Sequence, residues 1–134
     1  MHLCSEVKGR VTLEGKPFAN QSIIRSLTYE EEEVDSVYTD EDGNFSFKAK
    51  SLKSKLPGGI FHEPVVKITI GIKYYNEVYI LWNGFQHATK TPTEFKKHLL
   101  KLNAELTSEK IKHHLVNPKK TSEEHFISSI CRWN

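Results

Sequence analysis

The sequence lacks any long apolar run. No stretch approaches the roughly 18 to 20 apolar residues of a membrane-spanning helix, so we expect no membrane span. The N-terminus, Met1-His2-Leu3-Cys4, also lacks the basic start and apolar core of an export signal. As written, the sequence predicts a cytoplasmic protein. The alternative is a periplasmic protein from which an export signal has been removed.

Short catalytic motifs are absent as well. The sequence contains no Gly-x-Ser-x-Gly, no glycine-rich phosphate loop and no paired-carboxylate motif. It has no His-x-x-x-His or His-Glu-x-x-His spacing, and the adjacent His113 and His114 would point about 100° apart on a helix. We therefore expect no enzyme, no histidine-based metal site and no cofactor.

An acidic turn is the one place where the spacing resembles that of a cation site. Asp40, Asp42 and Asn44 alternate as calcium-loop oxygens do. However, Gly43 stands at the fourth place of such a loop, and no glutamate occupies the twelfth, where a bidentate ligand belongs. A turn between strands explains all four residues, so we expect no metal here.

Cysteine is scarce. Cys4 and Cys131 are the only two cysteines, and they lie near opposite ends of the chain. If the terminal segments pair as neighbouring strands, a disulfide would close a loop of well over a hundred residues and stabilise the fold by about 4 kcal/mol. The alternative is two small, half-buried thiols on adjacent strands, which the cytosol keeps reduced.

Charge is weak in total but uneven along the chain. A formal net charge of +2 is too small to indicate a nucleic-acid partner, and we expect none. No Lys or Arg occurs from Ser26 to Phe47, whereas lysines outnumber acids from Lys90 to Lys120. Such polarity steers and orients a charged protein partner; the alternative is a solvated strand edge whose charges prevent aggregation. The candidate partner-binding acids are Glu30, Glu31, Glu32, Glu33, Asp35, Asp40 and Asp42.

Many segments of the sequence have the alternation of apolar and polar residues that is typical of β-strands. Its 134 residues, of which 37% are hydrophobic, can bury one core, so we expect a single domain over residues 1–134. Apolar residues alternate with polar ones in several segments. We expect strands over 6–13, 22–29, 34–39, 44–49, 65–73, 77–82 and 98–106.

Two pairs of these segments predict β-hairpins. The first spans 34–47 and turns at 40–43, where an Asp-Gly pair suits a tight turn. The second joins 65–72 to 77–82 and, being rich in β-branched and aromatic residues, is expected to form the central pair of a sheet. The four glutamates at 30–33 repel one another and are expected at an exposed bend before the first hairpin.

Short helices are expected only in the C-terminal third. Thr91 and Pro92 form a helix start, and a helix over 107–116 would place Ile111 and Leu115 on one face. The apolar tail should dock on the body, because its Phe and Trp are costly to expose. Since no long helices separate the strands, we expect an all-β sandwich.

Two motifs carry a family resemblance. The segment VKGRVTLEGKPFANQSI, followed by SVYTDEDGNFSF, resembles the transthyretin-like, carboxypeptidase-regulatory-like family. The resemblance implies a seven-stranded β-sandwich and a generally non-catalytic role in adhesion, folding or partner binding. Cys4 near the start and Ile130-Cys131-Arg132-Trp133 near the end make the chain similar to an uncharacterised bacterial subfamily of this fold, some members of which are met near interbacterial toxin (type VI) secretion genes. The segment Ala19-Asn20-Gln21 departs from the more usual Ala-Gly-Ala of the motif.

The resemblance and the charge pattern together predict a protein-binding module. Its most concrete form is an immunity-type protein that occludes a cognate secreted toxin with a basic surface. The acids at 30–42 would make this contact together with Tyr74, Trp82 and Phe85, and the loop 51–64 is the alternative interface. A second hypothesis is a structural, accessory or carbohydrate-facing module of a secretion or cell-envelope system. Its aromatic platform would consist of Tyr74, Tyr75, Tyr79, Trp82 and Phe85.

Overall fold

The computed structural model describes residues 2–29, 31–51, 65–87, 93–117 and 120–133. The described residues are mostly strand and contain twelve strands and one helix. The elements are β1 His2–Cys4, β2 Val7–Leu13, β3 Lys16–Pro17, β4 Ser22–Tyr29, β5 Glu31–Tyr38, β6 Asn44–Phe47, β7 Lys50–Ser51, β8 Val65–Tyr74, β9 Glu77–His87, α1 Thr93–Leu99, β10 Leu102–Glu105, β11 Ile111–Asn117 and β12 Lys120–Ser129. In the described part of the chain, no helix is long and apolar enough to cross a membrane.

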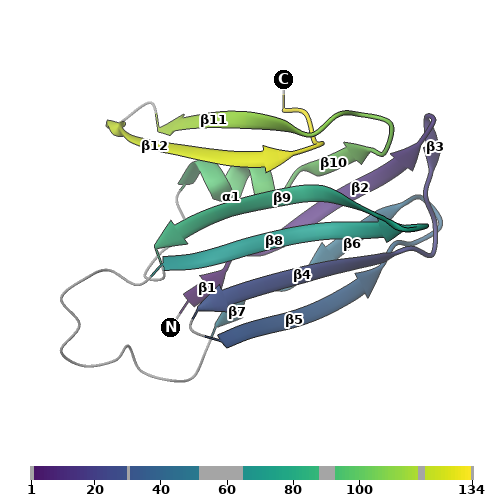
Figure 1. Ribbon diagram of the computed structural model, residues 1–134, viewed down its shortest axis with the longest axis horizontal. Coiled ribbons are helices and arrows are strands. Elements are labelled where there is room, and N and C mark those ends of the chain that lie inside the picture. The colour runs from purple at the N-terminus through teal and green to yellow at the C-terminus, as the bar shows by residue number, and fades with distance from the viewer. Residues whose placement is uncertain (1, 30, 52–64, 88–92, 118–119, 134) are drawn as a thin grey trace.

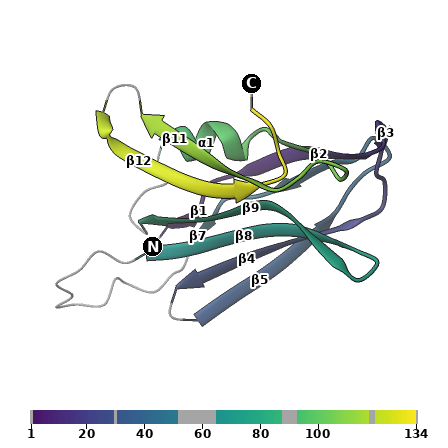
Figure 2. The ribbon, with the colours of Figure 1, turned by 45° about the horizontal axis from the view of Figure 1, so that its top comes forward.

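The strands form two larger sheets and a short ribbon. The large sheet has six strands in the order β11-β12-β9-β8-β4-β5, and every neighbouring pair is antiparallel. In the smaller sheet β2 pairs with β10, β3 and β6, while β1 and β7 form the ribbon. Figure 1 shows the smaller sheet and α1 behind the large sheet, and Figure 2 shows the same layers tilted. The coarse prediction of a predominantly β protein is therefore confirmed.

The core lies between the layers because each strand sends alternate side chains inward. In β8 the isoleucines 68, 70 and 72 are fully buried, and in β6 Phe45 and Phe47 are buried from the other layer. The helix contributes Phe95 and Leu99, four residues apart on one face and both buried. One close approach requires glycine: a Cβ at Gly9 of β2 would lie 2.1 Å from the carbonyl oxygen of Leu102 on the parallel neighbour β10.

The predicted hairpin of 65–82 is confirmed. β8 and β9 pair along their length and occupy the centre of the large sheet. The connection turns at Tyr75, which adopts a left-handed φ of 55°. A register shift after Ile70 leaves Leu81 as an extra residue in β9.

The predicted hairpin of 34–47 is wrong. β5 pairs with β4 over its whole length, and β6 pairs with β2 in the other sheet, so the segment turns a corner between the two layers. The turn itself forms as predicted, with Gly43 N donating to Asp40 O at 3.0 Å. Alternation identified both strands, but it carries no information about which strand each one pairs with. The expected bend at 30–33 is displaced too, because residues 31–33 belong to β5, while residue 30 lies outside the described residues.

In the C-terminal third, the helix and the strands lie at other positions than the sequence predicts. The expected strand over 98–106 begins only at Leu102, because residues 93–99 form α1. The expected helix over 107–116 is wrong, since Ile111–Asn117 is strand β11, paired with β12. The pairing partner outweighs a weak local helix preference. The predicted helix start at 91–92 lies outside the described residues, and the docking of the tail is confirmed by the burial of Ile127, Ile130 and Cys131.

The two terminal strands do not pair with each other. β1 pairs with β7, whereas β12 pairs with β11 and β9. The expected pairing of end strands, on which the disulfide prediction depended, is therefore wrong, and both Cys4 and Cys131 are free and buried. Burial raises the pKa of each thiol to about 11. Cys4 lies beside Arg25, whereas the Cys131 Sγ lies 3.7 Å from the carbonyl oxygen of Leu81.

Candidate functional site

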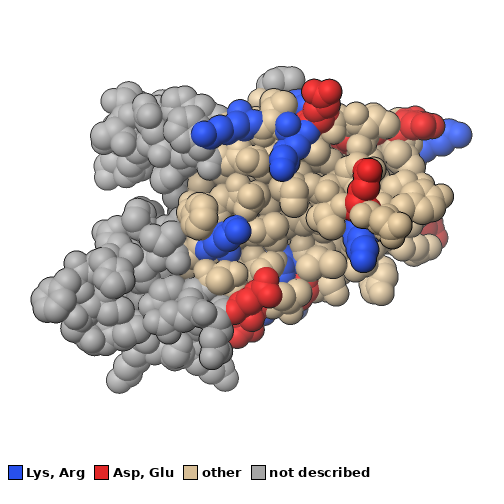
Figure 3. Space-filling view, in the orientation of Figure 1, with Lys and Arg blue, Asp and Glu red and all other residues tan. Residues whose placement is uncertain are grey.

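The outward side of the large sheet is the main candidate surface. Over β5, β4, β8 and β9, the side chains opposite the core point away from the smaller sheet; we call this surface the open face. Its exposed large apolar residues are Ile24, Val34, Tyr38, Val78 and Phe85, with exposed fractions of 39%, 56%, 72%, 62% and 59%. Figure 3, which views the molecule from the side where the large sheet lies in front, shows a mainly uncharged surface with both blue and red groups on it, several of which adjoin along the top and at the right.

The sheet register brings two predicted site residues onto the same face. Glu32 lies opposite Thr28, Thr28 opposite Lys67, and Lys67 opposite Phe85. Three strand spacings of about 4.8 Å place Glu32 and Phe85 roughly 14 Å apart in one row. In the next row, Thr69 donates a hydrogen bond to Asn83 at 3.2 Å between small polar side chains. The open face therefore combines small polar side chains, the charged Glu32 and Lys67, and exposed apolar side chains.

The glutamates at 30–33 do not form one acidic surface, because Glu32 and Glu33 lie on opposite sides of β5. Because side chains alternate along β5, Glu32 points to the open face and accepts a hydrogen bond from Ser26 Oγ at 2.5 Å. Glu33 points to the opposite side, where its carboxylate lies 3.9 Å from the ammonium of Lys50. Glu30 and the side chain of Glu31 lie outside the described residues. Of the acids whose side chains are described in this run, only Glu32 lies on the open face.

Asp35 forms an ion pair with a buried arginine inside the fold. It binds the guanidinium of Arg25 with both carboxylate oxygens, at 3.0 and 2.6 Å. Arg25 is only 2% exposed; it also donates to the carbonyl oxygen of Lys48 at 2.9 Å and stacks over Phe47 at 4.7 Å. A buried guanidinium needs a paired anion, so Asp35 supplies internal charge compensation. The structure thus gives Asp35 a role inside the fold and leaves it little freedom to contact a partner.

Asp40 and Asp42 belong to the corner between the layers. Asp40 Oδ1 accepts hydrogen bonds from the backbone N–H groups of Asp42 and Asn44, both at 2.9 Å. The carbonyl oxygen of Asp42 accepts from Arg10 Nε at 2.8 Å. Asp40 and Tyr38 also line an open hollow of about 480 Å³ at the end of β5. The acids of the turn therefore lie next to the exposed ring of Tyr38, but one carboxylate oxygen of Asp40 already holds the turn together.

The predicted aromatic cluster is not assembled. Trp82 is completely buried and packs edge-on against Phe95 at 4.9 Å, so it belongs to the core. Tyr74 is half-buried against Phe18, with ring centroids 5.0 Å apart. Phe85 stands on the open face, while Tyr75, at 82% exposure, sits in the turn between β8 and β9. A joint contact surface or sugar platform that includes Trp82 is incompatible with this packing.

Four residues of the open face were missed from the sequence. Ile24, Val34, Tyr38 and Val78 fall in predicted strands, and apolar residues in a strand are ordinarily assigned to the core. The signal that could have found three of them is the pair Arg25 and Asp35, opposite each other in neighbouring strands. If that ion pair points inward, strand alternation makes Ile24, Val34 and Tyr38 point outward. Among the described residues, no group of three or more His, Cys, Asp or Glu side chains is placed to hold a metal ion.

Comparison with known proteins gives one family. Residues 7–109 match the model of a domain of unknown function, DUF6795. No curated protein and no solved structure matches the chain. The matched segment contains the four strands β4, β5, β8 and β9 that build the open face, and it ends before β11 and β12. Because this segment makes up more than half of the sequence, the chain belongs to the DUF6795 family of domains of unknown function.

Proposed function

We propose that this protein is a non-enzymatic module that binds another protein through the open face of its large sheet. The observation that carries the proposal is the exposure of five large apolar side chains on a face with few charges. Contiguous apolar patches rimmed by polar residues mark interaction surfaces, and Ile24 lies diagonally beside both Val34 and Tyr38 across the β4–β5 pair. Specific interfaces combine apolar and aromatic anchors with a polar rim, and the open face has this composition.

The anchors are the two exposed aromatic rings. Tyr38 at 72% exposure and Phe85 at 59% stand on strands at opposite sides of the face. Tyrosine is enriched among the residues that dominate binding energy, because its ring buries a large area with few rotatable bonds. The two rings stand in different rows on strands at opposite sides of the face, so a broad partner surface can contact both more readily than a small ligand can.

The rim indicates the sign of the partner's charge. Glu32 lies exposed at the edge strand β5, in the longest segment of the sequence that has no Lys or Arg, whereas the exposed Lys67 and Lys73 lie on the inner strand β8 of the same face. A basic partner surface is therefore steered toward this edge, and its association slows as salt screens the charges. The resemblance of the sequence to the transthyretin-like family favours a secreted bacterial toxin as the partner, with this protein as its immunity-type inhibitor built on a transthyretin-like sandwich. A structural, accessory or carbohydrate-facing role of a secretion or cell-envelope system is the competing proposal.

Binding kinetics against the purified products of neighbouring genes test this proposal. The double variant Tyr38→Ser, Phe85→Ser removes both anchors, and we expect its affinity to fall by about thirtyfold or more. Tyr75→Ser is the matched control, because it removes an even more exposed ring that lies in the turn, and it should bind normally. Glu32→Gln should mainly slow association at low salt. Unchanged binding by the double variant, or salt-insensitive binding of sugars in place of a protein, would overturn the proposal.

A further inference from the structure

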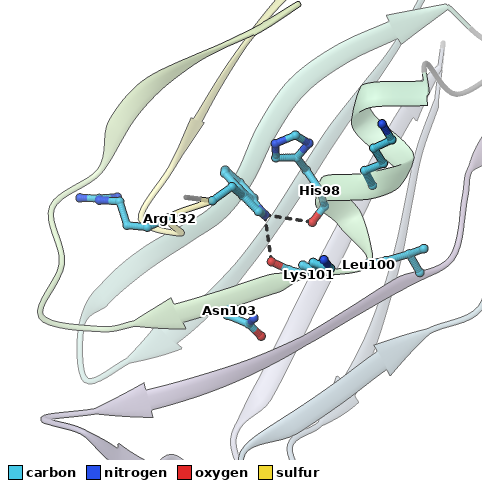
Figure 4. Close-up of a pocket in the computed structure, with 7 residues that line it drawn as sticks. His98, Leu100, Lys101, Asn103 and Arg132 are labelled. Carbon is cyan, nitrogen blue, oxygen red and sulfur yellow. Dashed lines mark hydrogen bonds between the residues drawn. The ribbon is translucent and has the colours of Figure 1, made fainter. Parts of the chain in front are cut away.

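A cleft at the C-terminal end of α1 has a composition unlike that of the open face. It encloses about 550 Å³ between the end of α1, the start of β10 and the last described residues of the chain. Its lining includes Lys97, His98, Leu100, Lys101, Arg132 and Trp133. Figure 4 shows Arg132 on one side of this cleft and Leu100 on the other, with His98 and Lys101 between them.

The wall of the cleft is held firmly. Trp133 Nε1 donates hydrogen bonds to the carbonyl oxygens of His98 at 3.3 Å and Lys101 at 2.9 Å. The indole also packs edge-on against His98 and His113, with ring centroids 4.8 and 4.9 Å away. These contacts tie the end of the chain to the helix, so the cleft keeps its shape without a ligand.

Arg132 is fixed in place without losing its charge. Its Nη1 donates to the carbonyl oxygens of Ile130 at 2.9 Å and Cys131 at 3.0 Å, and its Nη2 donates to that of Glu109 at 2.7 Å. All three acceptors are neutral, and the guanidinium has five N–H groups. Two donors and the full positive charge remain for a ligand, and a pre-positioned side chain loses little entropy on binding.

Among the residues that the structure describes, no Asp or Glu lines the cleft. Glu105 is the carboxylate nearest in sequence on β10, but it is engaged elsewhere: it accepts from Gly15 N at 2.7 Å and from Thr107 N at 2.9 Å. Within the described residues, Lys101 and Arg132 form no ion pair. Cations gathered in a concave site with an apolar wall attract and retain anions, because charge-assisted hydrogen bonds are stronger than neutral ones.

We propose that this cleft binds a small organic anion carrying at least two negative charges, as carboxylates or phosphates. Its volume falls within the range of small-molecule sites, and the positions of Arg132 at one side of the cleft and of Lys101 in its middle suit a ligand with two separated charges. The cleft is distinct from the open face, so this proposal stands independently of the proposed protein partner.

The test is an NMR titration of the ¹⁵N-labelled protein with citrate and with pyrophosphate, in separate arms at constant ionic strength. Saturable shifts at residues 97–103 and 132–133 are expected in at least one arm, with a dissociation constant near or below about 1 mM. The responding arm identifies the class of anion, carboxylate or phosphate. No saturable shift in either arm would overturn the proposal.

A matched pair of variants assigns the binding to the cleft. Lys101→Gln removes an exposed charge from the lining and should weaken binding about tenfold, while Lys48→Gln removes the same charge after β6 and should have no effect. Both lysines are exposed, so both variants should fold. Equal weakening by the two variants would show a non-specific response to net charge and contradict the proposed site.

Discussion

The ion pair of Arg25 and Asp35 gives the sharpest stability prediction. Arg25 is 2% exposed, and its guanidinium receives both oxygens of Asp35 at 3.0 and 2.6 Å. Removing one partner of a buried pair leaves an uncompensated charge and costs 3–5 kcal/mol as a central range. Because the Asp35 side chain is 34% exposed, water can partly replace it. We therefore expect Asp35→Ala to lower the free energy of unfolding by about 3 kcal/mol.

Urea unfolding followed by the fluorescence of the buried Trp82 and the half-buried Trp133 measures this loss. With an m-value of about 1.5 kcal/mol per M, the midpoint should fall by about 2 M. The control is Glu32→Ala, which removes an exposed acid from the same strand and should cost less than about 1 kcal/mol. The double variant Arg25→Met, Asp35→Ala should recover most of the loss, because no buried charge remains. If Asp35→Ala and Glu32→Ala cost the same, the assignment of Asp35 to the fold is refuted.

Three further predictions follow from single contacts. Gly9→Ala should lower the melting temperature strongly, because its Cβ would lie 2.1 Å from Leu102 O; an unchanged melting temperature would contradict the close β2–β10 approach. Although desolvation raises the pKa of Glu105, hydrogen bonds from Thr107 and Gly15 lower it to about 2. The stabilisation by Glu105 is therefore fully present above the pKa of this group in the unfolded chain, and it is lost as the pH falls toward 2. Glu105→Gln should make the free energy of unfolding depend less on pH in this acidic range. An unchanged pH dependence would count against the hydrogen bonds from Thr107 and Gly15. Cys4 and Cys131, with pKa values near 11, should resist thiol reagents until the protein unfolds; rapid labelling of the native protein would contradict their burial.

The sequence was informative where structure depends on neighbours along the chain. The strand over 22–29 and the hairpin of β8 and β9 were predicted because alternation and turn residues are local signals. The turn at 40–43 formed for the same reason. Sheet membership is a long-range property, so the local pattern predicts a hairpin at this turn although the two strands that flank it enter different sheets.

The candidate site was predictable only in part, and Asp35 shows why. In β5, Val34 and Tyr38 look like the buried side and Asp35 like the exposed side. The buried Arg25 on β4 reverses this assignment, because its charge needs Asp35 inside. The reversal places Val34 and Tyr38 in solvent and creates much of the open face. Nothing in the local sequence of β5 contains this information, since it depends on which residue lies opposite Asp35.

Methyl cross-saturation in the complex with the partner tests the central claim most directly. The open face carries methyl groups on Ile24, Val34 and Val78, with exposed fractions of 39%, 56% and 62%. Leu100 and Ile111, exposed at 43% and 41%, provide control methyl groups away from this face. Saturating the protons of the partner should attenuate the first set and spare the second. Attenuation of Leu100 and Ile111, with Ile24, Val34 and Val78 unaffected, would contradict binding through the open face.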